Sequence, residues 1–279
     1  MTIVYYLMTH RGSGQILRLV ERLRRSDNSF VLVHHDANRP PISLPKDERI
    51  AVVPDPVGVE WGKISVVLAM WKAIEWLRAT GMPFDWLIYL SGQDYPVKPA
   101  ITVENELASR PHIHAYVHHE LISEKPISGE RYYRSLCRRR YFCRRVKVPA
   151  MVPLYIKRRH PFRSRFQCFA GSQWVNLSHA AVDSLWQRRS VAKELIAYHA
   201  RSSVPDETVF HTLLANDPTL QLENNDKRFI LWKDDADSPE ILTSRHLEAI
   251  RSSGDWFARK VDETISRDLL AQLDRLMLS

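Results

Sequence analysis

The sequence predicts an α/β fold in which helices flank a mostly parallel central sheet. Apolar runs with the length of buried strands alternate with stretches whose apolar residues recur at helical spacing. The runs at 2–8 and 86–90 contain no alternating polar residues, which is typical of strands buried on both faces. Each run ends abruptly in a polar turn, as expected where parallel strands bring side chains to one edge of a sheet.

The order of the predicted elements supports this class. The polar stretch 9–14 separates the first strand from a helix that carries arginines opposite its apolar face. Glycine and proline at 81–83 end a second helix, and Ser178 is a suitable N-cap for a later one. We expect strands at 2–8, 30–34, 50–53, 86–90, 114–118, 166–177 and 229–232, and helices at 15–25, 66–77, 103–109, from 178, 191–199, 207–214 and 269–278.

The stretch 85–98 is the centre of the prediction. The strand at 86–90 stops at Ser91, and the proline at Pro96 cannot donate to a central ladder. Ligands of open α/β sheets bind beyond the carboxyl ends of the strands, so Asp94 is placed where chemistry usually occurs. The alternative is a polar turn in which Asp94 only caps a helix that begins near Ile101.

Length and composition indicate a globular protein. The chain has 279 residues, of which 44% are hydrophobic and 26% charged. No run approaches the roughly 18 apolar residues of a membrane span, and the N-terminus lacks the layout of a secretion signal. Three cysteines without a CxxC pair argue against a disulfide framework or a cysteine zinc site. We therefore expect a single domain over 1–279, located in the cytoplasm.

Positive charge is concentrated between Arg131 and Arg165. This segment contains thirteen Lys or Arg and no acidic residue, with tyrosines and phenylalanines interleaved, in a chain of net charge +8. Such a segment can bind nucleic acid, an anionic membrane surface or a phosphate-bearing substrate. It can equally be a solvated basic loop.

A glycine-containing turn follows the first strand. Gly12-Ser13-Gly14 begins a dinucleotide-binding fingerprint, but the third glycine is absent, which disfavours a nucleotide-dependent oxidoreductase. The N–H groups of this turn point to the edge at which Asp36 follows the second strand. A nucleotide can lie there without the full fingerprint, with the Asp36 carboxylate accepting hydrogen bonds from its base or ribose.

Two acidic residues follow Pro205. Asp206 and Glu207 stand where a helix is expected to start, and carboxylates in a first helical turn often only complement the helix dipole. The functional alternative is a general base at the rim of the sheet. No metal site is expected from the histidines between 112 and 119, because they alternate as in a strand without an HExxH motif.

Short motifs occur in a fixed order from residue 3 to about residue 262. They are Leu7–His10, Val33–Asp36, Glu60–Gly62 with Ser65, Leu90–Pro96, Ala170–Trp174, Pro205–Glu207 with Phe210–Thr212, Asn224-Asn225 up to Trp232, and Phe257–Asp262. Each is short, but their order and spacing resemble the core-2/I-branching family, glycosyltransferase family 14, in a bacterial-type form. This family contains β-1,6-N-acetylglucosaminyltransferases and peptide O-xylosyltransferases.

The resemblance implies a GT-A-like fold, with a Rossmann-type nucleotide-binding half over about 1–125 and an acceptor-binding and catalytic half over about 126–279. It implies an inverting enzyme that transfers N-acetylglucosamine or xylose from a UDP-sugar to an acceptor hydroxyl. The family works without a divalent metal, so neither a metal nor a cofactor is expected. Fixed cations must then stabilise the leaving diphosphate.

Matching the motifs residue by residue implies roles at the site. Glu207 falls on the catalytic base of the family, and Asp94 is the rival base because it matches a carboxylate of the xylosyltransferase branch. Lys260 with Arg259 matches the cations at the leaving diphosphate, and Arg245 is a further candidate. The remaining matches are His10 and Asp36 at the uridine, and Trp174, Glu130, Arg131 and Trp61 at the substrate.

The resemblance also bears on partners. Animal members carry a membrane anchor and many disulfides, and this sequence shows neither, so we expect a cytoplasmic form whose acceptor is a glycan, a peptide or a lipid-linked molecule. The basic segment 131–165 is expected to rest on anionic lipid at the inner face of the membrane. The non-enzymatic alternative is a nucleic-acid-binding protein using this segment, which predicts salt-dependent DNA binding without UDP binding.

Overall fold

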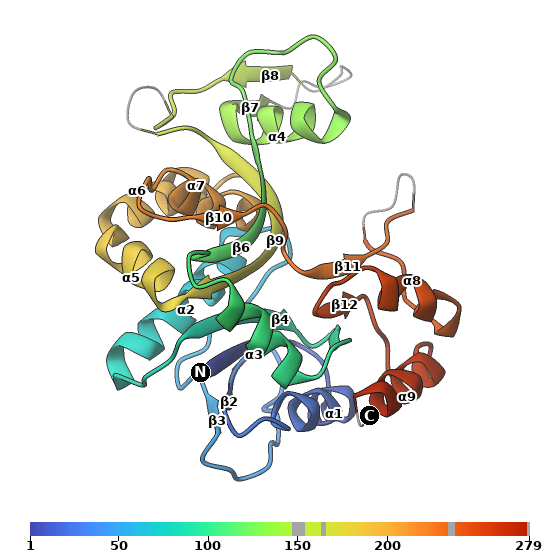
Figure 1. The fold of residues 1–279 in the computed structure, drawn as a ribbon. Coiled ribbons are helices and arrows are strands. Elements are labelled where there is room, and N and C mark those ends of the chain that lie inside the picture. Colours follow the sequence, from blue (N-terminus) through green and yellow to red (C-terminus); the bar gives the residue numbers. More distant parts are fainter. Residues whose placement is uncertain (147–153, 163–165, 234–237, 278–279) are drawn as a thin grey trace.

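A seven-stranded sheet forms the centre of the molecule in the computed structural model, which describes residues 1–146, 154–162, 166–233 and 238–277 (Figure 1). Its strands are β1 (Ile3–Thr9), β2 (Ser29–His35), β3 (Ile50–Val52), β4 (Trp86–Ser91), β6 (Ala115–Leu121), β9 (Phe169–Ser178) and β10 (Leu222–Glu223). Their order is β10-β6-β9-β4-β1-β2-β3, and all pairs are parallel except the two made by β9. The predicted α/β class with a mostly parallel sheet is confirmed.

Helices pack on both faces of this sheet. Tyr5 of β1 belongs to a core formed with α1 (Ser13–Leu23), α3 (Ala100–Ser109), α8 (Leu247–Ser252) and α9 (Arg267–Leu276). The next residue, Tyr6, belongs to a core formed with α2 (Ile64–Thr80), α5 (His179–Gln187), α6 (Arg189–His199) and α7 (Val209–Ala215). Both tyrosines are almost fully buried because successive side chains of a strand point to opposite faces. This explains the unbroken apolar runs in the sequence.

A second, three-stranded sheet corrects two expectations. It consists of β5 (Asp94–Pro96), β12 (Phe257–Arg259) and β11 (Arg228–Ile230), and β5 runs antiparallel to β12 with Asp94 opposite Arg259. The alternative in which Asp94 caps the helix near Ile101 is wrong, because Pro99 occupies the N-cap of α3. The strand expected at 229–232 is also not the last, since β12 follows it. Pro96 is tolerated because β5 is an edge strand.

The basic segment forms a helix and two strands. The sequence also allowed a solvated basic loop. It contains α4 (Tyr132–Phe142), β7 (Cys143–Val146) and β8 (Leu154–Lys157), with β7 and β8 paired antiparallel. Residues 147–153 and 163–165 of the segment lie outside the described ranges. The three cysteines of the chain are free, as expected.

The helix expected from Glu207 begins later. Pro205–Glu207 form a short 3₁₀ turn, η1, without a side-chain cap, and α7 starts at Val209. The interruption arises from the backbone, because Val204 adopts a left-handed conformation with φ 46° before the turn. A second 3₁₀ turn, η2, spans Ser244–His246.

The central sheet draws strands from both sides of residue 125. β9 lies between β4 and β6 and so joins the two predicted halves within one sheet. The division into a nucleotide-binding and an acceptor-binding half, and the single domain over 1–279, stay predictions. Among the helices of the described ranges, none has the length and apolar character needed to cross a bilayer.

Candidate active site at the carboxyl edge of the sheet

The carboxyl ends of three neighbouring strands meet at one edge of the central sheet. The backbone N–H of Asp36 donates to the Thr9 carbonyl at 2.9 Å, which joins the ends of β2 and β1. The N–H of Gly92 donates to the Met8 carbonyl at 3.0 Å, which joins the ends of β4 and β1. The polar turns that follow these strands therefore lie side by side, where open α/β sheets bind ligands.

The chain after β12 reaches the same edge. The Gln15 side chain of α1 donates to the carbonyls of Gly92 at 2.6 Å and Val261 at 3.3 Å. The Val261 N–H in turn donates to the Gln93 carbonyl at 2.9 Å. These bonds bring Lys260, which precedes Val261, to the turns after β1 and β4.

Asp36 is held by the loop that follows it. The side chain is buried, and its Oδ1 accepts hydrogen bonds from the backbone N–H groups of Asn38 at 3.0 Å and Val59 at 2.9 Å. The second oxygen, Oδ2, lies 3.9 Å from the Arg39 guanidinium. One carboxylate oxygen thus shapes the loop, and the other faces a cation.

His10 lines a cavity of about 360 Å³, a size that suits small ligands. Partial burial of the ring and the neighbouring Arg11 lower the pKa of His10 below its usual value, so the imidazole is mainly neutral at pH 7. The cavity is lined by His10, Arg11, Gly12, His35, Arg39 and residues 40–43.

Asp94 is completely buried. Its Oδ2 accepts hydrogen bonds from the Ser91 backbone N–H at 2.7 Å and the Ser91 hydroxyl at 2.5 Å. Its Oδ1 lies 3.7 Å from Nε of Arg228, whose side chain is also fully buried and donates to the carbonyl of Tyr89 and the side-chain oxygen of Asn176. Asp94 therefore forms a buried ion pair with Arg228, and its side chain has no solvent-accessible surface in this structure.

A group of cations lies above this ion pair. The Arg259 guanidinium stacks on the ring of Trp174 at 4.2 Å, and its Nε makes no hydrogen bond within the described ranges. Burial lowers the pKa of Arg259, and burial together with Arg259 and Arg11 lowers the pKa of Lys260. Crowded cations of this kind are stabilised by a bound anion. Trp174 itself is buried.

Glu207 is held in a turn that is supported by the segment at Gly62 and by helix α4. The preceding Val204 N–H donates to the Gly62 carbonyl at 2.9 Å, and the Val204 carbonyl accepts from the Tyr141 hydroxyl at 3.2 Å. The Glu207 side chain is 28% exposed and lies 3.7 Å from Nη1 of Arg140. The backbone of this turn is therefore held in position, and the Glu207 side chain is partly exposed, with Oε2 buried and without a hydrogen bond within the described ranges.

The environment of Glu207 suits a general base. Burial, assisted by the neighbouring Asp206 carboxylate, raises the pKa of Glu207 to about 7, while Arg140 acts in the opposite direction. Burial also raises the pKa of Asp206 to about 6. Proton transfer is most efficient when the pKa of the base lies near the working pH.

Strand β9 connects the Glu207 turn to the cations. The hydroxyl of Thr208, next to Glu207, donates to the Phe169 carbonyl at 2.8 Å at the start of β9. Trp174, whose ring stacks against the Arg259 guanidinium, lies further along the same strand. At about 3.3 Å per residue, the five steps from Phe169 to Trp174 span about 16 Å. Glu207 and Arg259 thus flank one stretch of β9.

The other predicted substrate residues are more peripheral. Trp61 is 80% exposed and precedes Gly62, which contacts the Glu207 turn. Glu130 lies 3.4 Å from the Arg138 guanidinium, and the largely exposed Arg131 lies 3.8 Å from Glu120. Both pairs involve α4 or its N-cap, and α4 also provides Arg140, the ion-pair partner of Glu207.

Arg245 is engaged elsewhere. Its guanidinium is paired with Glu240, and its side chain is 67% exposed. The same segment contacts Lys260 through the backbone, because the Leu242 N–H donates to the Lys260 carbonyl at 2.8 Å. Arg245 is therefore near the cation group but directed to a carboxylate.

Several arginines at the site were missed in the sequence, among them Arg228, Arg11 and Arg140. Arg228 follows Asp226-Lys227 and directly precedes the apolar run 229–232, so the sequence gives little sign that its side chain is buried. Arg11 directly follows His10 at the end of β1, where proximity to the site could have been inferred. Arg140 offered no signal, because it is one of many arginines in the basic segment and its position depends on how α4 packs.

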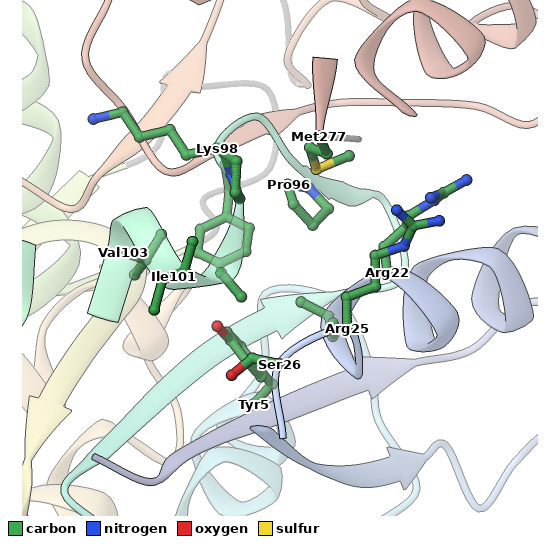
Figure 2. Close-up of a pocket in the computed structure, with 13 residues that line it drawn as sticks. Tyr5, Arg22, Arg25, Ser26, Pro96, Lys98, Ile101, Val103 and Met277 are labelled. Carbon is green, nitrogen blue, oxygen red and sulfur yellow. The ribbon is translucent and has the colours of Figure 1, made fainter. Parts of the chain in front are cut away.

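A second cavity lies away from this edge. It has a volume of about 300 Å³ and opens between α1, α3 and the end of α9 (Figure 2). Tyr5, Arg22, Lys98, Ile101 and Met277 are among its lining residues, and none of the predicted site residues is. The cavity beside His10 is therefore the one relevant to the predicted nucleotide.

Comparison with known proteins identifies the family. The model described as "Branch: Core-2/I-Branching enzyme" matches residues 3–251. Beta-glucuronosyltransferase GlcAT14B of Arabidopsis thaliana is 23% identical over 92% of this chain and 62% of its own length. Xylosyltransferase 1 of Homo sapiens is 22% identical over 98% of this chain and 30% of its own length. The chain thus spans only part of these relatives.

Solved structures give weaker likenesses. A glycosyltransferase involved in the glycosylation of the major capsid of PBCV-1 superposes with a TM-score of 0.44 at 10% identity, covering 99% of this chain and 98% of that protein. Mouse xyloside xylosyltransferase 1 gives a TM-score of 0.39 at 14% identity, covering 91% and 97%. The family match extends over most of the chain and agrees with the motifs in the sequence and with the mixed α/β sheet. The chain belongs to the Core-2/I-branching enzyme family.

Proposed function

We propose that this protein is an inverting glycosyltransferase that moves a sugar from a UDP-sugar to an acceptor hydroxyl. The observation that supports the proposal is the arrangement along β9: a partly exposed carboxylate with a pKa of about 7 beside the start of the strand, and crowded cations beside Trp174 further along it. Membership of a family of glycosyltransferases supports it, whereas the comparisons give the nucleic-acid-binding alternative no support.

The proposed step uses groups of this chain. Glu207 accepts the proton of the acceptor hydroxyl as its oxygen attacks the anomeric carbon. The bond from that carbon to the diphosphate oxygen breaks, and Lys260 with Arg259 stabilises the charge on the departing UDP. His10 and Asp36 face the uridine end. Asp94 then serves to hold Arg228 and the β4–β5 turn, which makes Glu207 the better candidate for the base.

The donor and the metal requirement can be tested together. Relatives are named for glucuronic acid, xylose and N-acetylglucosamine, so the panel comprises the three corresponding UDP-sugars. We expect UDP release from one of them that is unchanged by EDTA, because fixed cations meet the diphosphate. The sequence contains an Asp-x-Asp pair, Asp235 and Asp237, outside the described residues. Activity lost in EDTA and restored by Mn²⁺ would show that a metal is required.

Lys260→Met is expected to lower turnover by about 10²–10³-fold, since removing one preorganised group at a developing charge has that effect. UDP release under single-turnover conditions measures it. Arg251→Met is a matched control, because Arg251 is exposed and paired with Glu248 on α8. Equal turnover in both variants would remove Lys260 from the proposed mechanism.

A further inference from the structure

Strand β8 exposes apolar side chains on both of its faces. Leu154, Tyr155 and Ile156 are 51%, 43% and 56% exposed, although successive residues of a strand point in opposite directions. Tyr132, at the start of α4, is 82% exposed. Covering these exposed apolar side chains with a partner removes them from water, which lowers the free energy.

Uncompensated positive charge surrounds these side chains. Arg139, Arg144 and Arg159 are exposed and form no ion pair with a carboxylate within the described ranges. Arg139 also lies over the ring of Tyr155, at 5.8 Å from its centre. Five other cations of the segment are paired with acids that lie outside it: Arg131 and Arg134 with Glu120, Arg138 with Glu130, Arg140 with Glu207, and Lys157 with Glu124.

These residues lie together at one end of the molecule. Figure 1 shows α4, β7 and β8 projecting beyond the central sheet and its helices. The same unit contacts the candidate base, because Arg140 pairs with Glu207 and the Tyr141 hydroxyl donates to the Val204 carbonyl. Arg158, just after β8, donates to the Ser202 hydroxyl at 2.9 Å. A surface bound to this unit is thus close to the acceptor side of the site.

The chemistry of the surface matches a bilayer containing anionic lipid. Lipid headgroups can neutralise Arg139, Arg144 and Arg159, while the interfacial region below them accepts Leu154 and Ile156. A nucleic acid would meet the charges but leave these aliphatic side chains in water. Aromatic rings such as those of Tyr132 and Tyr155 favour the same interfacial depth.

We infer that the docking surface formed by Tyr132, Arg139, Arg144, Leu154, Tyr155, Ile156 and Arg159 binds the protein to anionic phospholipid membranes. Docking requires only these residues. Its consequence, that Glu207 faces an acceptor at the lipid surface, rests on the function proposed above.

Vesicle flotation of the full chain tests the inference. We expect binding to vesicles of phosphatidylcholine mixed with phosphatidylglycerol, weak binding to phosphatidylcholine alone, and loss of binding as salt rises. Reversing Arg139, Arg144 and Arg159 to Glu should weaken binding by at least about 100-fold, since each cation contributes about fivefold. Leu154→Ser with Ile156→Ser should weaken it by about tenfold or more.

Matched controls separate the surface from general effects. Arg25→Glu, Arg251→Glu and Arg267→Glu change the net charge equally, and Ile101→Ser with Ile265→Ser removes equally exposed apolar side chains elsewhere. These controls should float like the wild type. UDP release without vesicles reports on the proposed function independently of docking.

Three results would overturn the inference. The first is equal loss of flotation in the control and docking-surface variants. The second is tight binding of DNA by this surface without flotation. The third is a dimer in lipid-free solution that Leu154→Ser with Ile156→Ser dissociates, which would assign the surface to contact between two copies.

Discussion

Replacing Glu207 by glutamine is expected to lower turnover by about 10²–10⁴-fold, because the amide keeps the shape of the side chain but cannot take the proton of the acceptor hydroxyl. Donor affinity should stay within about twofold of wild type, since Glu207 is proposed to act on the acceptor. UDP release and UDP binding by calorimetry measure the two quantities separately. Full turnover in Glu207→Gln would move the role of base to Asp94.

The pH profile provides the control for this variant. A base must be ionised, so wild-type turnover should fall as the pH drops through about 7, the pKa of Glu207. In Asp206→Asn one neighbouring negative charge is removed, the pKa of Glu207 falls, and the decline should shift to lower pH. An unchanged profile in Asp206→Asn would argue against Glu207 as the titrating group.

Asp94→Ala is expected to lower the free energy of unfolding by about 3–5 kcal/mol, because it leaves the fully buried Arg228 guanidinium without its charge partner. The Ser91 backbone N–H and hydroxyl also lose their acceptor. Urea unfolding followed by circular dichroism measures the change.

An exposed ion pair supplies the comparison for Asp94. Asp27 is fully exposed and lies 3.6 Å from Arg49, so Asp27→Ala should leave the free energy of unfolding nearly unchanged. If Asp94→Ala proved as stable as wild type yet inactive, Asp94 would be assigned to the chemistry instead of to the buried ion pair.

Strands and helix ends could be predicted where neighbouring residues in the sequence specify them. The strands at 2–8 and 86–90 were found because burial on both faces requires an apolar side chain at every position, and Ser178 was recognised as an N-cap because its hydroxyl accepts from the Ala181 N–H of the same turn. Asp94 was misjudged as a possible helix cap for the opposite reason. Besides Ser91, its partners are Arg228 and the strand at Arg259, which are more than a hundred residues away.

The sequence alone determined the α/β class, the order of the main strands and helices, and the family, because hydrophobic period and motif spacing are written in consecutive residues. The tertiary structure decided which of the candidate site residues contact one another. It buried Asp94 against Arg228, stacked Arg259 on Trp174, and placed Arg140 of the basic segment beside Glu207. Burial and proximity to distant charges govern pKa and accessibility, and both depend on packing between segments that no local pattern specifies.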